Sequence, residues 1–220
     1  MTENPLSITE RNLIKTKKAV SIAIVAGVMI IDQLIKFAVK TKLSLYERIQ
    51  VTDWFEIRFT ENEGMAFGMD FIGTMFLAAF RVAAIAFFVY ILHNIIIKKA
   101  PMGFIVCFAM IIAGAAGNII DNSLYGLIFT ESNYAMPPAQ LVPFGEGYGS
   151  FLTGRVVDMF YFPLFEWPSW VPLVGGDVFF GAVFNFADAS ISCGAVALLI
   201  FYHKMLNADF LLKHDSRPKM

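Results

Sequence analysis

Hydrophobic residues gather into four long runs along the chain, separated by segments that mix charged, aromatic and turn-forming residues. The runs cover about residues 19–39, 71–97, 102–120 and 178–202. Each is long enough for an α-helix that crosses about 30 Å of hydrocarbon at about 1.5 Å per residue. The pattern predicts an all-α polytopic membrane protein with four transmembrane helices, in a single membrane domain over residues 1–220.

The basic residues that flank these runs predict the orientation of the chain. The first run is too long for the apolar region of a cleaved signal peptide and lacks a small-residue cleavage site, so we expect it to stay in the membrane. By the positive-inside rule both termini then face the cytoplasm. The basic residues before the first run, between the second and third, and after the fourth are Arg11, Lys15, Lys17, Lys18, Lys98, Lys99, Lys204, Lys213, Arg217 and Lys219.

This orientation leaves two longer segments, residues 40–70 and 122–177, on the extracytoplasmic side. Aromatic and polar residues alternate over residues 54–59, which predicts a strand and a small β-rich segment on the membrane surface. We expect this sheet to cradle an extended peptide. Residues 122–177 contain six prolines and two tryptophans, which predicts a long irregular loop at the level of the lipid headgroups.

Composition supports the membrane assignment. Hydrophobic residues make up 57% of the chain and charged residues 16%, with a mean hydropathy of +0.63, whereas soluble domains average roughly 45–50% and about 25%. The formal net charge of −1 provides no basic surplus for nucleic acid. The two cysteines, Cys107 and Cys193, lie in apolar runs and indicate neither a disulfide framework nor a zinc site.

Polar residues recur at helical spacing within or beside the apolar runs. A charge at the bilayer centre costs about 2.5–3.5 kcal/mol on insertion scales, so such residues are candidates for function. Spacings of three or four residues place two side chains on one helix face. The pairs are Asp32 with Lys36, Asn118 with Asp121, Arg155 with Asp158, and Asn185 with Asp188.

Most of these residues also have a purely structural interpretation. Asp32 and Lys36 are best explained as an ion pair, and Arg81 as a residue that snorkels or pairs with a partner. Asn118 and Asn185 are explained equally well as interhelical hydrogen-bonding residues or as groups that position a substrate or a carboxylate. Asp158 and Asp188 lie among apolar neighbours. Two facing carboxylates share a proton, which supplies a base and an acid at one pH. Buried carboxylates also serve as proton relays in proton-coupled transporters, and a non-enzymatic membrane scaffold is a further alternative.

Five short blocks in the sequence together resemble the signature blocks of bacterial signal peptidase II, the lipoprotein signal peptidase. They occur in the expected order over roughly residues 18–205. The blocks are Asp32-Gln33-Leu34-Ile35-Lys36, Asn62-Glu63-Gly64-Met65-Ala66-Phe67-Gly68, Gly114-Ala115-Ala116-Gly117-Asn118-Ile119-Ile120-Asp121, Val156-Val157-Asp158 and Phe184-Asn185-Phe186-Ala187-Asp188.

The resemblance implies an aspartic endopeptidase of the bacterial inner membrane that removes the signal peptide from diacylglyceryl prolipoproteins, just before the lipidated cysteine. It implies an active site near the extracytoplasmic face, contact with membrane lipid, no metal or other cofactor, and inhibition by globomycin. Asp158 and Asp188 fall on the catalytic positions, and Asp32 with Lys36 on a structural polar pair. Supporting or substrate-binding positions fall on Asn62, Gly64, Asn118, Asp121, Asn185 and Ala187.

The chain departs from the family pattern in two places. The family commonly has arginine directly after the aspartate of the third block, whereas Asn122 follows Asp121 here. We expect Arg155 to supply that charge. The 36 residues between Asp121 and Asp158 also exceed the length expected for the family.

Overall fold

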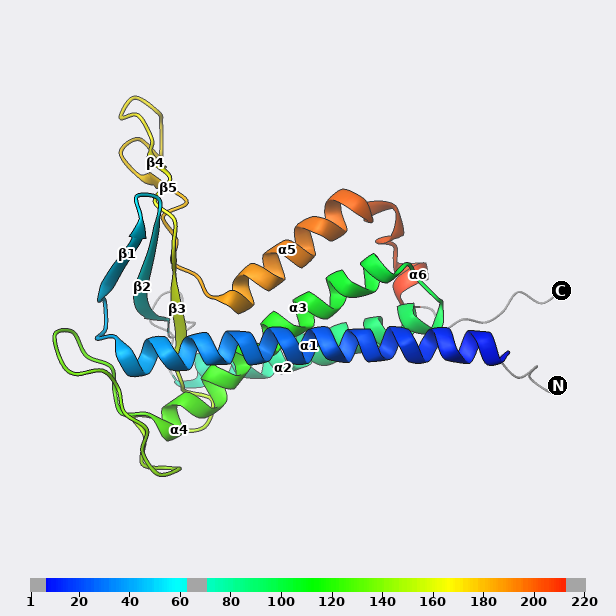
Figure 1. The fold of residues 1–220 in the computed structure, drawn as a ribbon, viewed down its shortest axis with the longest axis horizontal. Coiled ribbons are helices and arrows are strands. Elements are labelled where there is room, and N and C mark those ends of the chain that lie inside the picture. The colour runs from blue at the N-terminus through cyan, green and yellow to red at the C-terminus, as the bar shows by residue number, and fades with distance from the viewer. Residues whose placement is uncertain (1–6, 63–70, 213–220) are drawn as a thin grey trace.

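The computed structural model describes residues 7–62 and 71–212. Four apolar helices run side by side, with a small sheet at one end and the short helix α6 (Ala208–Leu212) at the other (Figure 1). They are α1 (Ile8–Lys42), α2 (Phe71–Ile97), α3 (Met102–Ile120) and α5 (Phe186–Phe201). Three of the described helices are long and apolar enough to cross a membrane, and α5, with 16 residues, is shorter.

The sequence predicted α2 and α3 closely, but α1 and α5 begin and end elsewhere. A capping box between Ser7 and Glu10 starts α1 well before the first apolar run, so the helix continues through the basic residues. The prediction that a helix begins at about Val178 is wrong, because Val178–Phe179 form strand β5, a turn follows at Phe180, and Asn185 caps α5. The aromatic side chains of this segment pack against other rings. Phe179, for example, stacks on Phe165 with their ring centroids 4.7 Å apart.

The sheet contains three antiparallel strands in the order β1 (Arg48–Thr52), β2 (Phe55–Asn62) and β3 (Val156–Tyr161). The predicted strand at residues 54–59 is confirmed by β2. The prediction of a wholly irregular segment at residues 122–177 is wrong, because β3 supplies the third strand and β4 (Phe165–Glu166) pairs with β5 (Val178–Phe179). The third helix also continues through a π-helical turn η1 (Asp121–Tyr125) into α4 (Gly126–Ile128).

Two apolar clusters hold the molecule together. The first lies among α2, α3 and α5, with Ile95, Phe104 and Ile105 fully buried. The second joins the end of α1 to the sheet and to η1, through residues such as Phe59, Val157 and Met159. Since Val157 and Met159 point into this cluster, period-two alternation turns Val156 and Asp158 to the opposite face of β3. This alternation places Asp158 toward the helices.

Candidate active site

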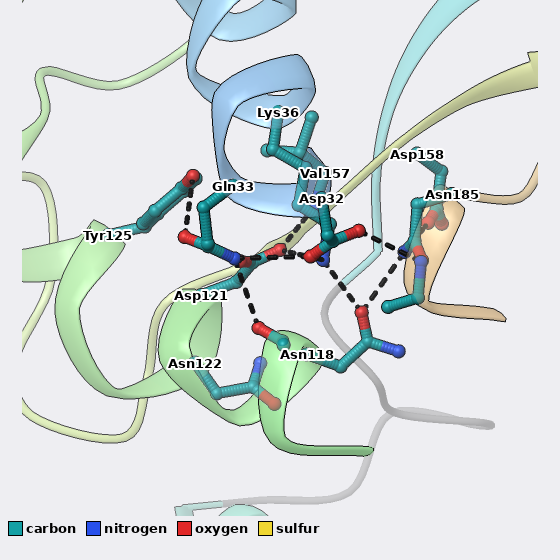
Figure 2. Close-up of polar contacts among 12 residues, drawn as sticks. Asp32, Gln33, Lys36, Asn118, Asp121, Asn122, Tyr125, Val157, Asp158 and Asn185 are labelled. Carbon is teal, nitrogen blue, oxygen red and sulfur yellow. Dashed lines mark hydrogen bonds and ion pairs between the residues drawn. The ribbon is translucent and has the colours of Figure 1, made fainter. Parts of the chain in front are cut away.

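The central feature of the site is a fully buried lysine bound by three acceptors (Figure 2). Lys36 Nζ lies 2.9 Å from Asp32 Oδ2, 2.8 Å from Asp121 Oδ2 and 2.8 Å from Asn118 Oδ1. An ammonium group has three N–H donors, so these three oxygens satisfy it. The expected pairing of Asp32 with Lys36 is confirmed, and Asp121 adds a second carboxylate from another helix.

Asp32 also holds the start of α5. Its Oδ1 accepts a hydrogen bond from the backbone N–H of Ala187 at 2.9 Å. Asn185 and Asp188 form a capping box, in which Asn185 Oδ1 accepts from the Asp188 N–H at 2.8 Å and Asp188 Oδ2 from the Asn185 N–H at 3.4 Å. These bonds satisfy N–H groups that a helix N-terminus leaves unpaired. The beginning of α5 is therefore tied to α1 deep in the protein.

Glycine on α3 allows this close approach. A Cβ atom at Gly114 would lie 2.2 Å from the carbonyl oxygen of Ala187, and one at Gly117 would lie 2.8 Å from Asp32 Oδ2. Any larger residue would push α5 or the Asp32 carboxylate away. The small residues of this block therefore set the distance between α3 and the residues that start α5.

Asp121 connects the helices to the sheet. Its Oδ1 accepts from Gln33 Nε2 at 2.8 Å, and its Oδ2 accepts from the Val157 backbone N–H at 3.2 Å. The Tyr125 hydroxyl lies 3.2 Å from Gln33 Oε1, which turns the Gln33 amide nitrogen toward the carboxylates. Because Val157 directly precedes Asp158 on β3, the bond from its N–H to Asp121 fixes the position of Asp158 relative to the helices.

Asp158 and Asp188 each accept a hydrogen bond from an asparagine. Asn118 Nδ2 lies 2.8 Å from Asp188 Oδ1, and Asn185 Nδ2 lies 2.7 Å from Asp158 Oδ1 and 3.1 Å from Asn118 Oδ1. The orientation of both amides follows from groups that only donate, namely Lys36 Nζ to Asn118 Oδ1 and the Asp188 N–H to Asn185 Oδ1. Each carboxyl group thus faces an N–H donor.

Both carboxyl groups line one cavity of about 280 Å³. The cavity has a polar wall around the two aspartates and an apolar wall from α2, α3 and α5. Asn62 lies opposite Val156 in the β2–β3 register, which places it on the same face of the sheet as Asp158. The lining residues are Asn62, Phe80, Arg81, Ala84, Ala115, Asn118, Val156, Asp158, Asp188 and Ile191.

The environment of Asp158, which lies on β3 outside the helices, favours the protonated form of its carboxyl group. Burial, followed by the neighbouring charge of Asp188, raises its pKa from 3.8 to about 7, while the hydrogen bond from Asn185 opposes the rise. Asp158 therefore holds a proton at a pH where an exposed carboxyl group has lost it.

The remaining residues that the sequence singled out lie around this centre. Ala187 is fully buried, and Gly64 lies outside the described residues. Arg155 Nη1 lies 3.2 Å from Glu131 Oε1 and 3.7 Å from Glu61 Oε2, and its guanidinium covers the Tyr148 ring. It is not among the residues that line the cavity. Its expected role in supplying charge to the site stays a prediction.

Sequence reasoning assigned no site role to Gln33, Tyr125 or Arg81. Gln33 and Tyr125 brace Asp121, and Arg81 lines the cavity and donates a hydrogen bond to Asn122. Arg81 was detectable as a charge inside an apolar run, but its partner lies on another helix. Among residues 7–62 and 71–212, no three His, Cys, Asp or Glu side chains are grouped to hold a metal ion.

Comparisons with known proteins place these residues in a family context. Residues 24–204 match the family model described as signal peptidase (SPase) II. The lipoprotein signal peptidase of Porphyromonas gingivalis (strain ATCC 33277) is 45% identical over 190 residues, which is 84% of this chain and 83% of that protein. The lipoprotein signal peptidase of Amoebophilus asiaticus is 32% identical over 196 residues, covering 84% and 77%.

Two solved structures share the fold. Both are described as bacterial membrane enzymes determined by the in meso method, and both are 24% identical to this chain. One has a TM-score of 0.57 and covers 83% of this chain and 91% of its own. The other has a TM-score of 0.56 and covers 91% and 95%.

Proposed function

The chain belongs to the signal peptidase II family, the aspartic peptidases that cleave signal peptides from prolipoproteins, and from this premise we propose that Asp158 and Asp188 are its catalytic pair. The observation that carries the proposal is that both carboxyl groups line one cavity and each accepts an N–H from one of two linked asparagines. Two carboxyl groups in one site share a proton, as in aspartic proteases.

The two carboxyl groups have different roles in the proposed reaction. Asp188 is the base, since Asn118 and the N-terminus of α5 stabilise its negative charge. Asp158 is the acid, since burial favours its protonated form. Asp188 removes a proton from water as the water oxygen bonds to the scissile carbonyl carbon. The Asp158 proton meanwhile forms a hydrogen bond to the carbonyl oxygen.

Breakdown of the tetrahedral intermediate completes the cycle. The C–N bond breaks as a proton passes from the pair of aspartates, Asp158 and Asp188 (the dyad), to the leaving nitrogen. This step releases the new amine and a carboxyl group. Asn118 and Asn185 position the dyad by hydrogen bonds. Lys36, which is paired with Asp32 and Asp121, orients Asn118, and Asp121 also binds the backbone of β3. Asn62, at the rim of the cavity, is suited to bind substrate backbone, and Gly64 and Ala187 are carried as supporting positions from the family blocks.

We assign the finer substrate class from the shape and polarity of the cavity. Phe80, Ala84, Ala115 and Ile191 form an apolar wall beside the polar dyad, which suits a peptide bond next to a lipid-modified residue. The proposed substrate is a diacylglyceryl prolipoprotein cut before its lipidated cysteine, taken directly from membrane lipid. A globomycin-type cyclic peptide would occupy the same cavity, and the β1–β2–β3 sheet would cradle the extended chain.

The proposed location is the bacterial inner membrane, with α5 as the fourth span and both termini cytoplasmic. Lys98 and Lys99, which follow α2, donate hydrogen bonds to Phe210 on α6 and to Glu10 in the first turn of α1, at the end of the bundle away from the sheet (Figure 1). This placement is in keeping with the positive-inside rule. The sheet and the dyad then lie at the extracytoplasmic end. The 16 residues of α5 rise about 24 Å, a shortfall that local bilayer thinning accommodates.

The test is cleavage of a purified diacylglyceryl prolipoprotein, read as a mass shift, by wild type and by the Asp158→Asn and Asp188→Asn variants. We expect wild type to cleave and each variant to lose activity at least about 10³-fold without unfolding at a lower temperature than wild type at pH 7. Asp177→Asn, which neutralises an exposed carboxyl group on the loop before β5, is the matched control and should cleave like wild type. Full activity in either dyad variant would overturn the assignment.

A further inference from the structure

Arg81 is the charged residue of the cavity that the proposed reaction leaves without a role. It lies on α2 and lines the same cavity as the α5 residues Asp188 and Ile191. Its Nη1 donates a hydrogen bond to Asn122 Oδ1. Asn122 in turn donates to the Gly154 carbonyl oxygen at 2.7 Å, which joins Arg81 to the loop before β3.

Charge and donor count indicate what this guanidinium can bind. Arg81 and Asp188 are close enough for their charges to attract. A negatively charged ligand would meet this carboxylate, so a neutral acceptor is the better match. A guanidinium has five N–H donors, more than the bond to Asn122 uses. A carbonyl oxygen in the cavity meets both conditions.

Arg155, the other arginine considered from the sequence, has a different environment. Two carboxylates, from Glu61 and Glu131, surround its guanidinium, and it does not line the cavity. Glu61 and Glu131 balance the charge of Arg155, and Glu61 lies on the face of the β2–β3 sheet opposite to Asp158. The chain therefore presents a guanidinium to the cavity from α2, although the position after Asp121 is an asparagine.

We propose that Arg81 binds the substrate, by donating N–H bonds to a carbonyl oxygen of the lipidated peptide close to the scissile bond. This inference rests on the proposed function. The carbonyl oxygen belongs either to the peptide backbone or to an ester of the glyceride, which have the same hydrogen-bonding chemistry. The bond to Asn122 holds the guanidinium in place before the substrate arrives.

The test measures KM and kcat separately for the full-length protein in detergent, with wild type, Arg81→Ala, Arg81→Lys and Asn122→Ala. Loss of a charge-assisted hydrogen bond predicts a rise of about 10- to 100-fold in apparent KM for Arg81→Ala. We expect kcat to fall by a smaller factor than KM rises, since Arg81 also attracts the charge of the base Asp188, and the unfolding temperature to stay near that of wild type. Arg81→Lys, which keeps the charge but loses the fork of donors, should fall between the two.

Two controls separate binding from a structural role. Val82→Ala changes the exposed neighbour of Arg81 on the same helix and should leave KM unchanged. Asn122→Ala removes the bond to Arg81 but keeps the cation, so its effect on KM should be several-fold smaller. An unchanged KM in Arg81→Ala, or an equal rise in KM in Asn122→Ala, would overturn the inference.

A second substrate with ether-linked chains identifies the carbonyl. An equal loss in Arg81→Ala on ester and ether substrates assigns the peptide carbonyl, and a smaller loss on the ether substrate assigns the glyceride ester. Failure of the wild type to cleave either substrate would refute the proposed function itself. Cleavage by wild type with an unaffected Arg81→Ala variant refutes only the role of Arg81.

Discussion

Lys36 orients Asn118, because Lys36 Nζ lies 2.8 Å from Asn118 Oδ1 and an ammonium group can only donate. The amide nitrogen of Asn118 is therefore turned to Asp188 Oδ1, 2.8 Å away. A buried ion pair on α1 thereby determines which atom faces the dyad. The ion pair therefore acts on the dyad through the Asn118 side chain, in which the amide nitrogen can be replaced by an oxygen atom.

Replacing Asn118 by aspartate tests this relationship. Asn118→Asp keeps an oxygen for Lys36 but turns the donor that faces Asp188 into a second acceptor, next to a carboxylate. Loss of one preorganised donor typically costs about 10²–10³-fold in rate, and we expect kcat to fall by at least that factor. The measurement is the cleavage rate at fixed pH together with the unfolding temperature.

Asn118→Ala is the comparison variant for Asn118→Asp, because it removes the acceptor for Lys36 as well as the donor to Asp188. It removes both atoms, so it should lower stability as well as rate, since Lys36 loses an acceptor in a buried site. A rate near that of wild type in Asn118→Asp would show that the orientation of this amide does not matter.

Lys36 is also predicted to be the main electrostatic support of the fold. Lys36→Met leaves the Asp32 and Asp121 carboxylates buried without their cation, and breaking a buried ion pair from one side costs about 3–5 kcal/mol. Lys15→Met, at an exposed position of the same helix, should change the free energy of unfolding by less than about 0.5 kcal/mol. Equal effects of the two variants, measured by denaturant unfolding in micelles, would contradict this role.

Hydropathy predicted α2 and α3 well, because lipid-facing and buried helix residues are both apolar. It failed at residues 178–185, where a two-residue strand and a turn precede α5, because a short apolar run does not by itself distinguish a strand from a helix. It also missed β3, since Val156–Tyr161 is a short run whose partners on β2 lie almost half of the chain away. Strand pairing between distant segments leaves little local pattern.

The candidate site divides in a similar way. Asp158 and Asp188 were recognised from short blocks, and the i,i+4 spacing of Asp32 and Lys36 predicted their ion pair. The contacts of Gln33, Tyr125 and Arg81 join helices far apart in the sequence, so no local spacing reports them. Which atoms of Asn118 and Asn185 face the dyad also depends on donors from other elements.

Gly114 is predicted to be intolerant of even one extra carbon atom. A Cβ at this position would lie 2.2 Å from the Ala187 carbonyl oxygen, so Gly114→Ala must displace the start of α5 and with it Asp188. We expect a loss of about 1–3 kcal/mol in stability and a marked loss of cleavage.

Gly27→Ala is the matched control for this prediction. Gly27 also lies within a helix, but a Cβ there meets nothing within 4 Å. That variant should gain about 0.5–1 kcal/mol from the better helix propensity of alanine. A functional, stable Gly114→Ala protein would show that α3 and α5 can separate without harm to the dyad.

The raised pKa of Asp158 predicts how stability depends on pH. The unfolded chain loses this proton near pH 3.8 and the folded protein near pH 7, so between these values the folded state binds more protons. The contribution of Asp158 to stability is thus present below about pH 4 and is lost as pH rises to about 7. The unfolding temperature of Asp158→Asn, relative to wild type, should increase from pH 4 to pH 7 and then level off. A constant difference would contradict it.

The same proton sets the alkaline limit of catalysis. Asp158 must be protonated to donate to the scissile carbonyl, so ionisation with a pKa of about 7 removes the active form as pH rises. We expect kcat/KM, which reports ionisation of the free enzyme, to fall above about pH 7 and to approach a tenfold loss per pH unit. Enzyme held at pH 9 and returned to pH 7 should recover its rate, which distinguishes titration from unfolding. A rate that stays constant from pH 7 to pH 9 would mean that Asp158 is not the acid, and the two aspartates would then exchange roles.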